Sequence, residues 1–455
     1  MKLISFLFAL FFASTLAASP VIDQSVFDEL ATSDRVRVVV MFDLDVPVSL
    51  SAIGQRGERR AAVARTTDDI LAHLAGGFVL SHRFELVSAI AGKIDRSALE
   101  RLRTHSQVRS ISADVGGSGH LDVAVPLLGM DFIQQSAPPG WDIDGSGIKV
   151  VVMDTGIDAS HDDFTGALVD EACFCLTAEA PHCCPNEAAT QFGEGSAADD
   201  HGHGTRVSSH ILGRGSVAPV GAAPGASLVA VKVLDSNNSF WGMADITAAF
   251  DWIAVNHPDA RVVNASLGSS VAVNFNCSLS STAWVVAVRD AVRAVNANGT
   301  LVIASSGNQG NADGIQVPSC LGEVMAIGAT WKQDTDGTFF GCEDVDPKLD
   351  DIACFSNTSP QLELLAPGVL MNSSDLGGGT ISGISGTSFA APLVAGCATL
   401  IRAAHPGLTW QEARALMLAS PIRVTDDRTD LIHPRLDCRH AIDYLLFGDK
   451  FQGVQ

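Results

Sequence analysis

The distribution of apolar residues divides the chain into two regions of different character. In the first region, an alternating run at 35–43 predicts a strand, and the spacing of apolar residues over 61–74 predicts a helix. A strand-like run at 84–94, a short helix near 97–103 and a strand at 108–111 follow. These elements fit a small α+β unit of βαββαβ type.

A glycine-rich stretch at 116–119 ends this pattern, and we interpret it as a linker and a domain boundary. Beyond it, short β-branched runs alternate with helical segments, which predicts an α/β domain with a parallel sheet and helices on both faces. Ligands of such sheets bind at the carboxyl ends of the strands. The predicted strands are 148–153, 228–234, 261–263, 301–304 and 324–327.

Composition excludes some classes of partner. The 455 residues are 47% hydrophobic, which is enough for a large core and a smaller module. A formal net charge of -22 leaves no broad basic surface, so we expect neither nucleic acid nor membrane as a partner. This charge does not identify a reaction.

The first 19 residues have the anatomy of a secretory signal peptide. Met1 and Lys2 precede an apolar run at 3–16, and small residues follow at 17–19. A membrane anchor is the alternative, but the run is shorter than the ~20 residues that a membrane span needs. We therefore expect a secreted protein.

Ten cysteines in an exported chain predict disulfides. Two local pairs are suggested, Cys277 with Cys320 and Cys342 with Cys354, while Cys397 in helical surroundings is equally compatible with a buried free thiol. Spacing leaves the pairing open. Four further cysteines lie close together in the sequence: Cys173, Cys175, Cys183 and Cys184. A zinc site that includes His182 or His201 is the alternative for this cluster, but its spacings lack the C-x2-4-C pairs that are usual in zinc sites.

Four residues at strand ends or helix starts could perform acyl transfer. Asp154 ends an apolar strand, and His203 lies between two glycines before a helix. Ser388 precedes the helix predicted at 393–404, with Pro392 in its first turn, and Asn308 follows the strand at 301–304. Each has a simpler interpretation when taken alone: Asp154 and Asn308 as turn formers, Ser388 as a helix cap, and His203 with His201, Asp199 and Asp200 as a metal site.

Together, these residues give the chain a resemblance to the subtilases, the subtilisin-like serine peptidases, over about 121–444. The order Asp, His, Ser is that of subtilisin. Supporting segments are Val231-Lys-Val-Leu234, Asn264-Ala-Ser-Leu-Gly268 and Leu365-Ala-Pro-Gly368. The main motifs are Asp154-Thr-Gly-Ile-Asp158, His203-Gly-Thr205, Ser306-Gly-Asn308 and Gly386-Thr-Ser-Phe-Ala390.

The resemblance implies a subtilisin-like catalytic domain with a triad of Asp154, His203 and Ser388 and with Asn308 in the oxyanion hole. It also implies two walls of the pocket for the residue before the scissile bond. One is a substrate-binding strand, Ser266, Leu267 and Gly268, and the other is Ser305, Ser306 and Gly307. The expected partners are protein or peptide substrates, and we expect a monomer that needs no cofactor for its chemistry.

The resemblance extends to the first region, which is similar to a subtilase propeptide, a small ferredoxin-like α+β domain. In that family the propeptide assists folding and inhibits the enzyme until it is removed. We therefore expect a signal peptide at 1–19, an inhibitory propeptide at 20–120 and a peptidase domain at 121–455. Self-cleavage is expected after His120 or Leu121.

Several positions depart from the family pattern. Arg206 stands where the family commonly has His, and Phe240 replaces a glycine near the distal substrate strand. Asp163 matches a calcium ligand of many relatives, but the segment 214–220 lacks the expected Asn, so structural calcium there is doubtful. Asp313 could favour basic substrates or could be a solvated loop residue.

The sequence disfavours two other functions. An α/β-hydrolase esterase requires the order Ser, Asp, His, which the short segment after Ser388 disfavours. A binding protein on an inactive peptidase scaffold would carry a substituted triad residue, and none is substituted. The sequence does not identify the residue preferred before the cut.

Overall fold

The computed structural model of the protein describes residues 20–44, 56–74, 76–83, 88–113, 124–136, 143–177 and 179–451. The chain divides into two compact units, one up to Gly117 and one from Ser118. The predicted signal peptide, the glycine-rich linker and the expected cleavage site lie outside the described residues.

The first unit is a five-stranded sheet with helices, in the order β1-β5-β2-β4-β3. Its antiparallel part, β5-β2-β4-β3, has the predicted ferredoxin-like arrangement. The prediction missed β1, α1 and β3, and only 89–94 of the run 84–94 is described as a strand. The elements are β1 (Val21–Ile22), α1 (Gln24–Thr32), β2 (Val36–Phe42), α2 (Arg56–Leu74), β3 (Phe78–Arg83), β4 (Ala89–Ile94), α3 (Arg96–Leu102) and β5 (Val108–Ala113).

The second unit contains an eight-stranded sheet in the order β17-β14-β12-β10-β6-β9-β7-β8. All neighbouring strands pair in parallel except β7 with β8. All five predicted strands are present, which confirms the parallel α/β class. The strands are β6 (Lys149–Asp154), β7 (Leu168–Phe174), β8 (Thr190–Phe192), β9 (Ser227–Lys232), β10 (Val262–Ala265), β12 (Leu301–Ser305), β14 (Val324–Thr330) and β17 (Leu364–Pro367).

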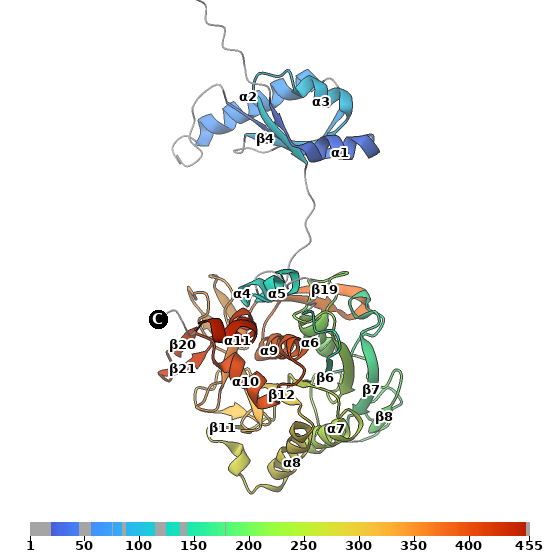
Figure 1. Ribbon diagram of the computed structural model, residues 1–455, viewed down its shortest axis with the longest axis vertical. Coiled ribbons are helices and arrows are strands. Elements are labelled where there is room, and N and C mark those ends of the chain that lie inside the picture. The colour runs from blue at the N-terminus through green and yellow to red at the C-terminus, as the bar shows by residue number, and fades with distance from the viewer. Residues whose placement is uncertain are drawn as a thin grey trace, which may run out of the picture. The chain divides into compact units, whose positions relative to one another are not determined.

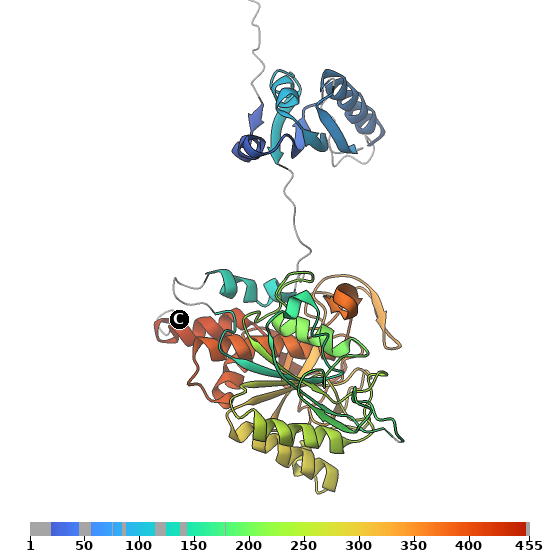
Figure 2. The ribbon, with the colours of Figure 1, turned by 90° about the vertical axis from the view of Figure 1, so that its right-hand side faces the viewer.

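Helices cover both faces of this sheet (Figures 1 and 2). Alternate residues of β6 enter two hydrophobic clusters: Val150 and Val152 pack with α6 and α9, whereas Val151 and Met153 pack with α7 and α8. This explains why the strands are continuously apolar. The helices of this unit are α4 (Ala124–Leu127), α5 (Met130–Ser136), α6 (His203–Leu212), α7 (Met243–Asn256), α8 (Ala283–Ala297), α9 (Thr387–Ala404), α10 (Trp410–Leu418) and α11 (Cys438–Phe451).

The loops around this core contain short two-stranded sheets. The pair β18 and β19 packs beside α6, and β11 pairs with β13 in the loop region after β12. These additions shape the surroundings of the strand ends. Their bounds are β11 (Ala272–Val273), β13 (Ile315–Gln316), β15 (Gly337–Phe339), β16 (Cys342–Asp344), β18 (Met371–Asp375), β19 (Gly379–Ile384), β20 (Arg423–Asp426) and β21 (Leu431–Pro434).

All ten cysteines form disulfides, so no free thiol is present. The two suggested local pairs, Cys277 with Cys320 and Cys342 with Cys354, are confirmed. A free thiol at Cys397 is wrong, because the cysteine is bonded to Cys438 and joins α9 to α11. The zinc interpretation of the remaining cluster is also wrong, since its thiols are consumed in Cys173 with Cys184 and Cys175 with Cys183.

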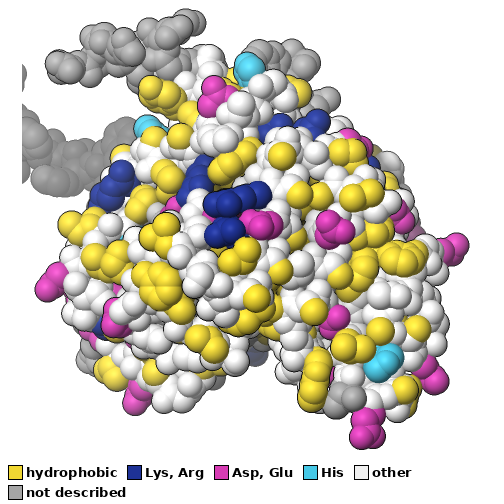
Figure 3. Space-filling view, turned by 90° about the horizontal axis from the view of Figure 1, so that it is seen from below, with side chains coloured by type: hydrophobic (Ala, Val, Ile, Leu, Met, Phe, Trp, Pro, Cys, Tyr) yellow, Lys and Arg dark blue, Asp and Glu magenta, His cyan; other side chains and the backbone are white. Residues whose placement is uncertain are grey.

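The surface agrees with the acidic composition. On the face shown in Figure 3, carboxylate side chains are scattered, whereas Lys and Arg side chains occupy few places. Among the described helices, α9 alone is long and apolar enough to cross a membrane, and 83% of it is buried inside the protein.

Candidate active site

The four side chains predicted to be catalytic come from elements that end or begin at one edge of the sheet. Asp154 is the last residue of β6, His203 the first of α6, Ser388 the second of α9, and Asn308 follows β12. The strands β9 and β7 lie on one side of β6, and β10, β12, β14 and β17 lie on the other. The chain therefore changes direction beside β6, where α/β sheets open a crevice for ligands.

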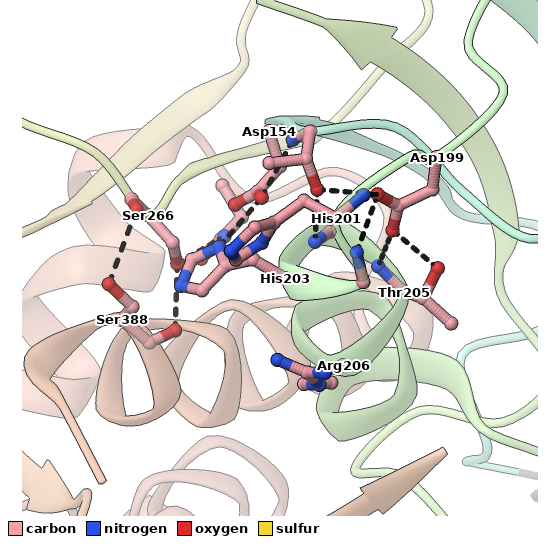
Figure 4. A network of polar contacts seen from close by, with 12 residues as sticks. Asp154, Asp199, His201, His203, Thr205, Arg206, Ser266 and Ser388 are labelled. Carbon is pink, nitrogen blue, oxygen red and sulfur yellow. Dashed lines mark hydrogen bonds and ion pairs between the residues drawn. The ribbon is translucent and has the colours of Figure 1, made fainter. Parts of the chain in front are cut away.

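Asp154 and His203 form a buried pair. The Nδ1–H of His203 donates to Oδ1 of Asp154 at 2.7 Å, and the backbone N–H of Thr155 donates to the same oxygen at 2.8 Å. The Asp154 carboxylate has no exposed surface. With the Nδ1–H directed at the carboxylate, Nε2 is the ring nitrogen that remains available to accept a proton. Figure 4 shows the ring between Asp154 and Ser388.

Asp199 holds the start of α6, on which His203 lies. Its carboxylate accepts hydrogen bonds from the backbone N–H groups of His201, Gly202 and Thr205 and from two hydroxyls, those of Thr205 and Thr155 (Figure 4). Burial would raise the pKa of Asp199, but these hydrogen bonds hold it below the usual value. The carboxylate is therefore an anionic cap that holds the start of the helix on which His203 lies.

Close backbone approach makes glycine necessary at one position of this helix start. A Cβ at Gly204 would lie 2.2 Å from the carbonyl oxygen of Gly156, at the turn after β6. The backbone N–H of Gly204 also donates to the Thr155 hydroxyl at 2.8 Å. Helix α6 thus lies directly against the turn that carries Asp154, which brings His203 within hydrogen-bond reach of the carboxylate.

Both carboxylates of the alternative metal site are already engaged. Lys232, a fully buried residue of β9, donates to Oδ1 of Asp200 at 2.7 Å and to the carbonyl of Thr155 at 2.8 Å. The carboxylate of Asp199 already accepts hydrogen bonds from backbone N–H groups at the start of α6. Within the described ranges, no group of three or more His, Cys, Asp or Glu side chains is arranged to hold a metal ion.

Ser388 lies in the first turn of α9, which begins earlier than predicted. The helix starts at Thr387, so Pro392 is inside it and not in its first turn, which corrects the expectation. Pro392 lacks the N–H that would bond to the carbonyl of Ser388. That carbonyl instead accepts the hydroxyl of Ser266 at 2.9 Å, and the Ser388 hydroxyl donates to the carbonyl of Ser266 at 3.3 Å.

The side-chain amide of Asn308 has a defined orientation. Its Oδ1 accepts hydrogen bonds from the backbone N–H of Thr387 at 2.9 Å and from the Thr387 hydroxyl at 2.8 Å. Its Nδ2 lies toward Gly386, 3.4 Å from where a Cβ would be. Since the oxygen is occupied, the NH₂ group is the end that can donate to a ligand beside Ser388.

A cleft of about 680 Å³ contains both Ser388 and Asn308. The predicted substrate-binding residues Ser266, Leu267 and Gly268 line it in the segment that follows β10, which is not itself a strand, and Ser305 and Gly307 line it at and after the end of β12. Ser306 is fully buried and is not among the lining residues. Phe240 lines the cleft as well.

Asp313 does not line the cleft. It is exposed and accepts a hydrogen bond from Asn274 at 3.2 Å. The solvated-loop interpretation of this carboxylate therefore fits the structure better than a role in binding basic substrates.

Asp163 serves as an anchor for a loop. Its carboxylate accepts hydrogen bonds from the backbone N–H groups of Ser216, Val217 and Ala218 and from the hydroxyl of Ser374. Burial opposes ionisation, yet these donors keep the pKa of Asp163 below its usual value. Because four donors already surround this carboxylate, it is poorly available as a calcium ligand.

Sequence reasoning missed several residues that position the site. The sequence assigns Asp199 only to a possible metal site, although an acidic residue just before a helix start is a known signal for a cap. Thr155, Lys232 and the hydroxyl of Ser266 act through long-range contacts and carry no local signal. Arg206 forms an ion pair with Asp375 of β18, at 2.7 Å, which explains how a cation is accommodated beside the site.

Comparison with known proteins gives related sequences and folds. Residues 145–435 match the sequence profile described as "Subtilase family". A "Thermostable alkaline protease" of Halalkalibacterium halodurans is 32% identical over 334 residues, covering 73% of this chain and 77% of the relative. "Subtilisin E" of Bacillus subtilis is 30% identical over 369 residues, covering 80% of this chain and 82% of the relative. A protease structure from Pseudoalteromonas arctica has a TM-score of 0.52 at 21% identity, covering 67% of this chain and 92% of that chain, a likeness of fold.

Proposed function

The chain belongs to the subtilase family and is a serine-type endopeptidase, and we propose that Asp154, His203 and Ser388 are its catalytic triad, with Asn308 in the oxyanion hole. The observation that supports the assignment is the buried hydrogen bond of 2.7 Å between His203 and Asp154, with Ser388, which lines the cleft, on the other side of the ring (Figure 4). Such an arrangement turns a neutral imidazole into an oriented general base.

The reaction follows from the positions of the protons. The Ser388 hydroxyl turns from the Ser266 carbonyl toward His203, gives its proton to Nε2 and attacks the scissile carbonyl. The imidazolium is stabilised by the carboxylate of Asp154. It then protonates the leaving amine, which departs as the first product and leaves an acyl-enzyme. Water, deprotonated by His203, hydrolyses that ester and restores the hydroxyl of Ser388.

Two donors are available for the negative oxygen of the tetrahedral intermediates. One is Nδ2 of Asn308, whose orientation is fixed by Thr387, and the other is the backbone N–H of Ser388 in the first turn of α9. The N-terminus of this 18-residue helix adds favourable electrostatic potential at the same place. These groups are in position before substrate binds, so little reorganisation is needed during the reaction.

The same proposal includes secretion and self-processing. A signal peptide at 1–19 directs export, residues 20–120 form an inhibitory propeptide, and 121–455 form the peptidase domain. Five disulfides support an oxidising destination. The alignment with Subtilisin E covers 80% of the chain, which is more than 121–455 alone, so the likeness extends into the first unit.

Expression of the wild type and of Ser388→Ala in a secreting host tests this proposal. The wild type should hydrolyse a protein substrate and begin near Leu121, because a covalently attached linker has a high effective concentration at the cleft. Ser388→Ala should be inactive and should retain the first unit after loss of the signal peptide. N-terminal sequencing and substrate hydrolysis are the measurements. An active Ser388→Ala chain would refute the triad, and an active wild-type chain that begins near residue 20 would refute the propeptide.

A further inference from the structure

We propose that Gln316 closes the pocket for the substrate side chain before the scissile bond, so that the enzyme cleaves after short side chains that can form a hydrogen bond, serine and asparagine above all. This inference rests on the proposed function, because it concerns the pocket beside Ser388. It assigns to this chain a specificity that sequence alone left open.

Gln316 reaches the pocket from outside the main sheet. It belongs to β13, which pairs with β11, the short strand that follows the wall ending at Gly268. Its backbone N–H donates to the carbonyl of Ser306, on the opposite wall, at 3.2 Å. The backbone of Gln316 is thus held beside both predicted walls of the pocket.

The side chain of Gln316 fills the space between these walls. A Cβ on Gly268 would lie 2.4 Å from Oε1 of Gln316, and a Cβ on Gly307 would lie 2.6 Å from the same oxygen. One amide oxygen therefore touches the two glycines that face each other across the pocket. The stem of the side chain is equally close, because the Gly268 position is 2.7 Å from Cβ of Gln316. A phenylalanine or lysine side chain would have to displace this amide.

The amide of Gln316 also lacks a protein partner. The residue is 8% exposed, lines the cleft together with Ser388 and Asn308, and its side chain forms no hydrogen bond with any described residue. A substrate side chain that covers this amide removes its contact with water, which costs roughly 1–3 kcal/mol if no new partner is supplied. A substrate group that pairs with it would recover this energy on binding, and an apolar group of the same size would not.

Two properties of the substrate side chain follow. It has to be short, because the amide occupies the depth of the pocket, and a hydroxyl or amide on it is favoured over an apolar isostere. Asparagine and leucine are a suitable pair for comparison, since they are similar in size and differ in polarity. Phenylalanine tests the depth of the pocket, because its ring fits only if the Gln316 amide is displaced.

The test uses the mature enzyme and peptides that differ only in the residue before the cut, which is Ser, Asn, Leu or Phe. The wild type should show kcat/KM at least about tenfold higher for Asn than for Leu or Phe. Gln316→Ala should open the pocket and raise the Phe-to-Asn ratio by at least about tenfold. Gln316→Met keeps the length without the amide, so it should still reject Phe and should lose the preference for Asn over Leu. Gln411→Ala, at an exposed glutamine of α10, is the control and should match the wild type.

The possible results separate this inference from the proposed function. A wild type that cleaves best after Phe or Leu, or an unchanged Phe-to-Asn ratio in a folded Gln316→Ala, would overturn the role of Gln316 while leaving the peptidase assignment intact. A wild type that cleaves none of the peptides and no protein substrate would overturn both. If Gln316→Ala fails to fold, the wild-type profile and Gln316→Met still decide the question.

Discussion

His210 makes the stability of the catalytic domain sensitive to acid. It lies in α6, two turns after His203, and is fully buried. Its Nδ1 lies 2.8 Å from the carbonyl of Arg206, and Phe389 packs beside its ring. Burial lowers the pKa of His210 to about 4; the hydrogen bond to Arg206 opposes this shift, and the positive charge of Lys332 adds to it.

The sign and size of the effect follow from proton binding. In the unfolded chain His210 takes up a proton as the pH falls below about 6.5, whereas the folded residue stays neutral until about 4. The unfolded state therefore binds more protons in this window, and the free energy of unfolding falls as the pH falls. At about 1.36 kcal/mol per pKa unit, His210 alone removes about 2 kcal/mol between pH 7 and pH 5 and about 3 kcal/mol below pH 4.

The measurement is urea unfolding at pH 7 and pH 5, made on the Ser388→Ala chain so that self-digestion does not interfere. In His210→Asn the amide can still donate to the Arg206 carbonyl, and the variant should lose about 2 kcal/mol less than its parent between the two pH values. The lowered pKa values of other buried histidines affect both proteins equally and cancel. His405→Asn, at an exposed histidine, is the control. Equal losses in parent and His210→Asn would refute the argument.

Three further predictions concern the oxyanion hole and the disulfides. Asn308→Ala should lower kcat by roughly 10²–10³, a range known from subtilisin itself, with little change in KM on a peptide substrate; wild-type turnover would remove Asn308 from the site. Replacing both Cys397 and Cys438 by Ser should lower the free energy of unfolding by about 2–4 kcal/mol in urea titrations, because their disulfide closes a 41-residue separation between α9 and α11. Thiol titration of unfolded, unreduced wild type should find no reactive thiol, and a free pair at these positions would contradict the connectivity.

Local patterns were sufficient for the class of fold and for selecting the candidate catalytic residues. The continuous apolar runs of β6 and β12 arise because both faces of the sheet are covered, and this burial is visible in the sequence itself. The ends of those runs also located Asp154 and Asn308. His203 was identified by its motif between glycines, since the close approach of α6 to the turn after β6 requires a residue without a side chain at Gly204.

Helix boundaries were harder to predict where tertiary contacts replace local hydrogen bonds. Pro392 suggested a later start for α9, because proline normally occupies the first turn. The helix begins at Thr387, and Ser266, in the distant segment after β10, satisfies the carbonyl that Pro392 leaves free. No spacing within the helix contains that information.

The sequence by itself determined the two-unit organisation, the parallel sheet and the candidates for the catalytic side chains, because apolar periodicity and short motifs are local properties. Only the tertiary structure decided which cysteines pair, which carboxylate anchors α6, and which side chain fills the pocket. Asp199, Cys438 and Gln316 all act on residues that become neighbours only through folding. The contacts of such residues depend on how distant segments pack, and the spacing of residues along the chain does not record that packing.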